Sequence, residues 1–180
     1  GSSSTITTGD YNTSVGTSAL QWNATGSYNL ALGKSALNKN TASYNVGIGV
    51  NAGYRTTSGA YNFYCGGNAG YNLTTGTKNV ALGYQAMYNG ETDDLTGNTA
   101  SYNIAIGYQC MGNEYGDDVA NFTGDKNVGV GYLSLSKLTS GDQNIGIGYD
   151  ALKDLTTADH NVAIGQGAGH NITTGTYNVA

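Results

Sequence analysis

Apolar and small residues alternate in a short segment that recurs along the whole chain. The clearest copies each begin with Asn and occupy residues 79–83, 103–107, 144–148 and 161–165. The first and third residues after Asn are mostly β-branched or Leu, as in Val80 and Leu82, and the second is almost always Ala, Gly or Ser. Because successive side chains of a β-strand point to opposite faces, this alternation predicts one short strand per copy.

The copies follow one another at a regular interval. The anchoring residues are Asn12, Asn29, Asn45, Asn62, Asn79, Asn103, Asn127, Asn144, Asn161 and Asn178, with spacings of 17, 16, 17, 17, 24, 24, 17, 17 and 17 residues. This period is too short for a helix pair or a propeller blade, and it fits one solenoid coil per interval. We predict an all-β protein, a parallel β-solenoid of about 17 residues per coil over residues 12–180, preceded by a lead-in at 1–11 that carries a tag-like Gly-Ser-Ser-Ser remnant.

Three other features of the repeat predict how each coil closes. The fourth residue after Asn is Gly in every complete copy, for example Gly83 and Gly107, which predicts a corner with positive φ or close backbone approach. A small residue three positions later, such as Ala86, suggests a second, shorter strand. The Asn residues of stacked coils would form a ladder of side-chain amides whose hydrogen bonds permit burial.

The two faces of the strand differ in size, and this difference predicts self-association. With the larger apolar residues turned inward, one coil buries too little surface to offset the ordering of its backbone. The opposite face is then a smooth strip, suited to close approach by another chain. The interface residues predicted on this basis are Ala31, Gly47, Tyr64, Ala81, Ala105, Gly129, Gly146 and Ala163.

The repeats resemble those of two families of trimeric surface fibres. The Asn-Val-Ala-Ile-Gly copy at 161–165 looks like the head repeats of YadA-type trimeric autotransporter adhesins. The longer form at 83–86, Gly-Tyr-Gln-Ala, looks more like repeats of bacteriophage tail fibres. The resemblance implies a homotrimer of left-handed parallel β-rolls, intertwined or side by side, with small strand residues near the threefold axis. The repeat unit of the adhesins is shorter than 17 residues, so the positions of their loops cannot be transferred to this chain.

Composition narrows the classes of function. The chain has 29 Gly, 15 Tyr, no Pro and a net charge of −5, and its seven Lys and Arg residues are scattered singly. Lys and Arg residues that are spread singly form no basic patch that could bind nucleic acid. No apolar run is long enough to insert in a membrane. No nucleic-acid partner and no membrane insertion are therefore predicted.

The two 24-residue intervals contain acidic loops, at 88–98 and 112–121. Their carboxylates suggest a receptor contact or, because oxygen ligands suit Ca²⁺, a cation site, with solvated loops as the plain alternative. The metal candidates are Glu91, Asp93, Asp94, Glu114, Asp117 and Asp118, and the receptor-contact candidates add Tyr88 and Tyr115. Calcium is the only cofactor that the sequence suggests.

Tyrosine occupies two repeat positions, before the anchoring Asn and after the corner Gly. Stacked rings would stabilise the rod, and exposed rings would bind glycans. Tyr64 breaks the small-residue rule at its strand position, and we interpret it as packing into a gap. Cys65 and Cys110 are interpreted as buried apolar residues without a disulfide between them, because they occupy different registers.

The repeats predict a structural and adhesive role. No catalytic constellation is present, and His160 and His170 lack metal ligands at a suitable spacing, so we predict no enzyme. The leading hypothesis is a segment of a trimeric phage tail fibre in the virion, with itself and a host receptor or glycan as partners. The alternatives are the head of a trimeric adhesin on a bacterial outer surface and, more remotely, an ice-binding solenoid.

Overall fold

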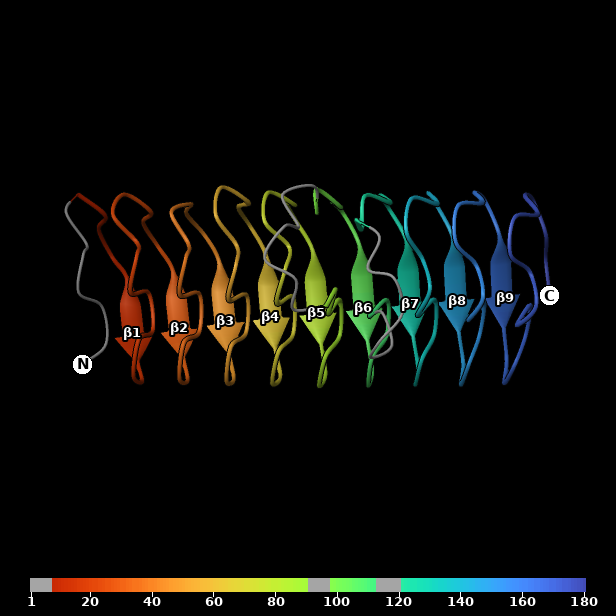
Figure 1. Ribbon diagram of the computed structural model, residues 1–180, viewed down its shortest axis with the longest axis horizontal. Helices are drawn as coiled ribbons and strands as arrows, with labels where there is room; N and C mark the ends of the chain where they lie inside the picture. Colours follow the sequence, from red (N-terminus) through yellow and green to blue (C-terminus); the bar gives the residue numbers. More distant parts are fainter. Residues whose placement is uncertain (1–7, 91–97, 113–120) are drawn as a thin grey trace.

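The chain forms a rod of stacked coils with one parallel sheet along its length. The computed structural model describes residues 8–90, 98–112 and 121–180. Nine three-residue strands lie side by side in chain order, and the first and last strands lie at opposite ends of the rod (Figure 1). The strands are β1 (Thr13–Val15), β2 (Leu30–Leu32), β3 (Val46–Ile48), β4 (Phe63–Cys65), β5 (Val80–Leu82), β6 (Ile104–Ile106), β7 (Val128–Val130), β8 (Ile145–Ile147) and β9 (Val162–Ile164). The predicted parallel β-solenoid is confirmed, and the described residues contain no helix.

Every strand pairs with the next in the same repeat register. The first residue after each anchoring Asn lies opposite its equivalent, as in Val46↔Phe63. The 24-residue intervals keep this register, because Val80 pairs with Ile104 and Ile104 with Val128. The extra residues of these two intervals therefore leave the sheet unchanged.

The interior of the rod is lined by the small residues of the strands. In β5, Ala81 is fully buried, and it packs in the same core cluster as Ala86 and Met87 from the turn that follows the strand. The flanking residues Val80 and Leu82 lie on the outer side of the sheet and are partly exposed. The strand faces are thus the reverse of the predicted arrangement.

This reversal overturns the predicted interface. A residue that is buried within its own chain cannot contact a second chain. The eight predicted interface residues therefore lie inside the coil and not at an interface. They are Ala31, Gly47, Tyr64, Ala81, Ala105, Gly129, Gly146 and Ala163, all buried.

The coil is too thin for larger inward side chains at the strand centre. A Cβ added to Gly47 would lie 2.8 Å from Cγ of Leu37 and 3.1 Å from the carbonyl oxygen of Ala52. Both atoms belong to the wall opposite the strand. Because that wall already fills the interior with Leu or Met, only a small residue fits opposite it.

Tyr64 is the one large inward residue among the strand centres, and two glycines make room for it. Gly53 and Gly70 stand where all other coils except the last, which has Gly169, carry Leu or Met, and a Cβ on either would collide with the Tyr64 ring. The Thr56 hydroxyl donates a hydrogen bond to the Tyr64 oxygen at 3.3 Å. Packing into a gap is confirmed for Tyr64, although the gap lies within the chain.

The segment after the strand is a series of tight turns. At Gly83 φ is +129°, and a Cβ there would lie 2.5 Å from the carbonyl oxygen of Gly107, so the predicted corner is confirmed. Two later residues of the same turn, Gln85 (φ 56°) and Met87 (φ 52°), adopt a left-handed backbone although neither is glycine. No second strand forms among the described residues, so that prediction is wrong.

The anchoring Asn residues form the predicted ladder. The backbone N–H of each one donates to the side-chain Oδ1 of its predecessor, for instance Asn144 to Asn127 at 2.8 Å. The Asn144 amide also donates to the carbonyl oxygen of Ala158 at 2.8 Å, which ties the strand to the turn that begins the next coil. The ladder is buried from Asn29 to Asn161.

Candidate functional site

The outer side of the sheet presents a continuous apolar surface. Two side chains from each strand, its first and third residues, make up this surface, which we call the apolar sheet face. The first row is Thr13, Leu30, Val46, Phe63, Val80, Ile104, Val128, Ile145 and Val162, and the second is Val15, Leu32, Ile48, Cys65, Leu82, Ile106, Val130, Ile147 and Ile164. Neither row contains a charged residue.

The size of this face distinguishes it from ordinary surface. Several of its members are substantially exposed, from 36% at Leu82 to 62% at Ile164. With strands about 4.8 Å apart and residues about 3.3 Å apart, the nine three-residue strands cover roughly 40 Å by 10 Å, or about 400 Å², and about 650 Å² together with the positions that border them on both sides. A contiguous apolar patch of this size is comparable to the largest patch on a typical monomeric protein, and such patches often mark an interaction surface.

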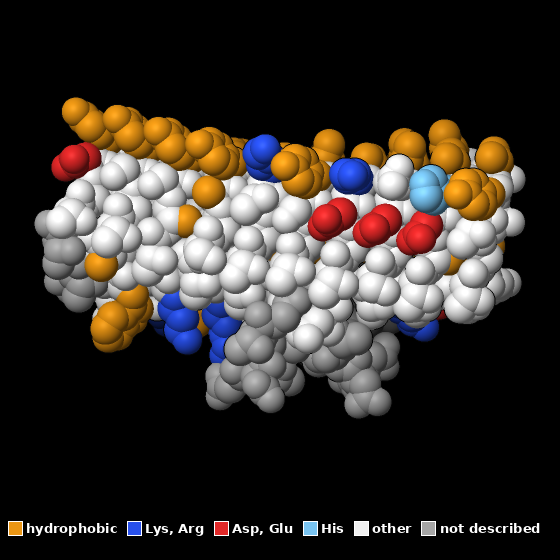
Figure 2. Space-filling view, turned by 90° about the horizontal axis from the view of Figure 1, so that it is seen from above, with side chains coloured by type: hydrophobic (Ala, Val, Ile, Leu, Met, Phe, Trp, Pro, Cys, Tyr) orange, Lys and Arg blue, Asp and Glu red, His pale blue; other side chains and the backbone are white. Residues whose placement is uncertain are grey.

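Rows of stacked aromatic rings border the face on both sides. Before the anchoring Asn, Tyr11, Tyr28, Tyr44 and Tyr61 stack with ring centroids 4.9–5.0 Å apart. Lys78 continues this row, with its Nζ 4.8 Å from the centroid of the Tyr102 ring. Figure 2 shows the row along one long edge, with hydrophobic side chains at both ends and Lys and His side chains between them. After the corner Gly, Tyr84, Tyr108, Tyr132 and Tyr149 form a second stacked row.

The stacking limits what these rings can bind. Tyr28 and Tyr44 lie 5.0 Å apart with an interplanar angle of 4°, so each ring face is covered by its neighbour. Sugars pack on ring faces, whereas these rows offer ring edges and hydroxyls to solvent. The geometry therefore favours the predicted ladder packing over a glycan surface. His160 extends the row by stacking on Tyr177 at 4.8 Å.

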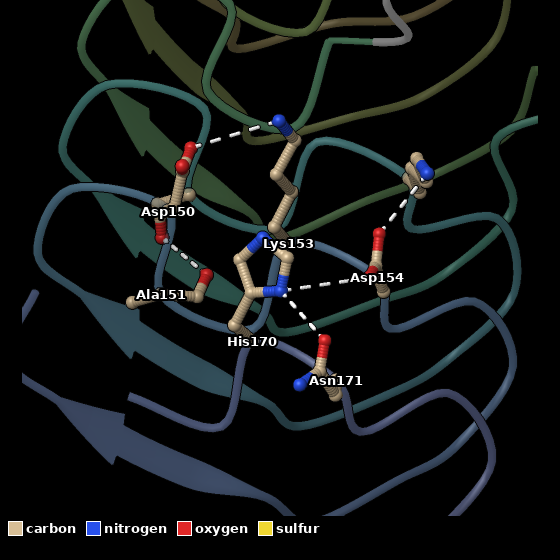
Figure 3. A network of polar contacts seen from close by, with 8 residues as sticks. Asp150, Ala151, Lys153, Asp154, His170 and Asn171 are labelled. Atoms are coloured by element: carbon tan, nitrogen blue, oxygen red, sulfur yellow. Dashed lines mark hydrogen bonds and ion pairs between the residues drawn. The ribbon is translucent and has the colours of Figure 1, made fainter. Parts of the chain in front are cut away.

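Charged side chains of the last coils form ion pairs. Asp154 lies 3.0 Å from Lys137 and 3.6 Å from His170, and Lys153 lies 3.9 Å from Asp150 (Figure 3). These ion pairs are partly exposed, so each adds little to stability.

A row of aspartates accepts hydrogen bonds from the backbone. Asp125, Asp142 and Asp159 occupy one position in three successive coils, and each Oδ1 accepts a hydrogen bond from a backbone N–H of the preceding coil at 2.7 Å. Within residues 8–90, 98–112 and 121–180, no three His, Cys, Asp or Glu side chains gather in a way that could hold a metal. The same residues contain no helix able to span a membrane.

Two buried titratable groups belong to the core. Burial raises the pKa of the Cys110 thiol to about 12 and raises that of the Tyr64 phenol well above its usual value. Both groups therefore stay protonated near neutral pH, which suits packing and not nucleophilic chemistry. Cys65 is a free thiol on the apolar sheet face and is only partly buried, so its interpretation as a buried residue is wrong.

The predicted acidic sites fall largely outside the described residues. Glu91, Asp93, Asp94, Glu114, Tyr115, Asp117 and Asp118 all lie there. Tyr88 is described and is only 2% exposed, with its ring 5.7 Å from that of Tyr71. A buried ring is not open to a receptor, so the prediction for Tyr88 is wrong.

The fold and its surface define a parallel β-solenoid with one uncharged apolar face. Comparison of the chain with protein-family models, curated proteins and solved structures gives no match.

Proposed function

We propose that this chain is a structural segment of a trimeric fibre whose copies associate through the apolar sheet face. The observation that carries the proposal is the uninterrupted, uncharged face that runs along nine strands. Burying such a face removes apolar side chains from water, which is the main favourable contribution to association.

The dimensions of the face suit association between copies of one rod. The face and the positions that border it, about 650 Å² together, approach the roughly 800 Å² that each partner contributes to a standard interface. An uncharged surface meets its own copy without placing like charges opposite each other. A rotation axis parallel to the rod brings the same face of every copy to the centre.

The number of copies and their role follow from the family resemblance. Phage tail fibres and YadA-type heads, which the repeats resemble, are trimers of left-handed rolls, and a tail fibre attaches the virion to its host. A stiff rod displayed in three copies gains avidity for a host surface through multivalent contact. An adhesin head on a bacterial outer surface is the alternative, because it needs the same rod.

The remaining hypothesis, an ice-binding solenoid, is not favoured by the threonines. The hydroxyls of Thr25, Thr41 and Thr57 donate to backbone carbonyl oxygens of the next coil at 2.9–3.1 Å. These groups are engaged within the chain, and on the apolar sheet face only Thr13 is a threonine.

Molar mass in solution tests the proposal. Analytical ultracentrifugation should give three chain masses for the wild type. Ile106→Lys, which places a charge in the second row of the face, should give one chain mass with an unchanged circular dichroism spectrum. Ser58→Lys is the matched control, because Ser58 is exposed and lies off the face, and it should remain trimeric. A folded, monomeric wild-type chain would contradict the proposal.

Attachment is tested separately. Trimeric protein, labelled on its amines, should bind to intact bacteria from a panel of strains, and the monomeric Ile106→Lys protein should bind far more weakly because avidity is lost. Equal binding by the two proteins would show that trimeric display is not required for attachment.

A further inference from the structure

Strand β4 is the one strand that contributes an unusual residue type to both rows of the apolar sheet face. Phe63 is the only aromatic residue among the strand positions of the face, and Cys65 is the only sulfur-containing one. Every other member is Val, Leu or Ile, apart from Thr13. The β4 coil therefore places the largest side chain of the face beside one of the smallest.

A repetitive face poses a problem of alignment. Equivalent residues recur about every 4.8 Å along the rod, so copies displaced by one coil would bury almost the same apolar area. Repeated, uniform β-surfaces specify their register weakly, and a single unusual residue can specify it in an otherwise regular interface. The face needs at least one level that does not tolerate displacement.

The packing beneath β4 holds Phe63 outward. Tyr64 fills the interior between Gly53 and Gly70, so no space remains there for a second ring. On the sheet, Phe63 pairs with Val46 and Val80, whose side chains are shorter. Phe63 is 38% exposed and is the largest side chain of its row.

We infer that β4 sets the axial register between copies of this chain, by bringing the Phe63 and Cys65 side chains of all copies to one level. The inference rests on the proposed self-association. In register, the rings pack together and the small thiols leave room for them. Displaced by one coil, each ring meets a Val or Ile row already at full packing and leaves a gap at its own level, and overpacking and cavities both weaken association.

Disulfide trapping tests the inference, because a disulfide requires Cβ atoms about 4 Å apart and so reports position sharply. Cys65 is the partly exposed thiol, and Cys110 is fully buried and serves as an internal control. Wild-type chains are mixed with chains carrying Cys65→Ser and Leu82→Cys, refolded together and oxidised with molecular oxygen and copper phenanthroline. Two thiols then lose two protons and two electrons to the oxidant for each disulfide formed.

The expected products are homotypic. Links between two Cys65 residues, and between two introduced cysteines at position 82, should exceed mixed 65–82 links by at least about fivefold, as the usual penalty for overpacking implies. Phe63→Val should keep the mass of the assembly and bring mixed links close to homotypic ones. Ile145→Val, a conservative change elsewhere in the same row, should keep the homotypic preference.

Each result separates this inference from the proposed function. A trimer in which mixed and homotypic links are equal in the wild type, or in which Phe63→Val changes nothing, overturns the role of β4 alone. A trimer without any of these links places the face away from the interface, and it overturns both this inference and the proposed association through the face. A monomer overturns the proposed function.

Discussion

Tyr64 shows how one residue alters the interior of a repetitive rod. Its position in the strand holds Ser, Ala or Gly in the other eight strands. The ring occupies volume that Gly53 and Gly70 leave empty by lacking the Leu or Met that most other coils carry at this position. Three positions in two coils therefore depend on one another, and the ring has no exposed surface.

Tyr64→Ala should destabilise the chain strongly. Removing a fully buried ring leaves a cavity that neither glycine can fill, which costs about 3–5 kcal/mol. Urea unfolding followed by circular dichroism measures the loss. Tyr61→Ala is the control, since Tyr61 is 56% exposed in the stacked row and should lose no more than about 1.5 kcal/mol. Equal losses in the two variants would contradict the internal role of Tyr64.

Cys110 should make the chain less stable in alkali. Its folded pKa of about 12 lies above the value of 9.0 for a free thiol, so above pH 9 the unfolded chain binds fewer protons than the folded one. The contribution is fully present below pH 9 and declines by roughly 1 kcal/mol per pH unit between pH 9 and 12. Urea unfolding at pH 8, 10 and 11 should show a steeper decline for the wild type than for Cys110→Ala. Parallel declines would contradict this prediction.

The asparagine ladder is the element that joins strand, turn and neighbouring coil. In the middle of the rod, Oδ1 of Asn144 accepts the backbone N–H of Asn161 at 2.9 Å, and its amide donates to Ala158. Both polar groups of the side chain are therefore satisfied where water is excluded. Losing such a side chain leaves its buried partners unpaired, which costs more than the bonds themselves contribute.

Asn144→Ala should accordingly cost about 3 kcal/mol or more, because several buried backbone groups lose their partners together. The neighbouring Gln143 is exposed, and Gln143→Ala should change stability by less than about 1 kcal/mol. The difference in urea midpoint between the two variants measures the effect. A loss at Asn144 as small as that at Gln143 would show that the ladder is dispensable.

The strands and their register could be predicted from sequence, but the inward face could not. Alternation in Val80, Ala81 and Leu82 is symmetric about the sheet, and hydrophobicity alone placed the larger pair inside. The missed signal was Met87 on the opposite wall, a large apolar residue that already fills the coil. The prediction of a second strand was wrong for another reason. Gln85 and Met87 adopt a left-handed backbone within the stacked coils, which their residue types do not indicate.

At the scale of the whole molecule, the rod is held together by contacts between adjacent coils. Each strand pairs only with the strands before and after it, so every coil adds one interface to the stack. The apolar sheet face, which runs along all nine strands, is left uncovered by this stacking. If copies cover it, folding and association become one equilibrium, and stability depends on the concentration of the chain.

Thermal unfolding should therefore shift with protein concentration. For three chains of 180 residues that unfold and separate together, an unfolding enthalpy of about 0.7 kcal/mol per residue gives a rise in Tm of roughly 5 °C for a hundredfold increase in concentration. Differential scanning calorimetry from micromolar to hundreds of micromolar chain measures the slope. Ile106→Lys should unfold at a lower Tm that does not change with concentration, because its charge keeps the copies apart. A wild-type Tm independent of concentration would mean that each rod is stable alone, with its apolar face reserved for another kind of molecule.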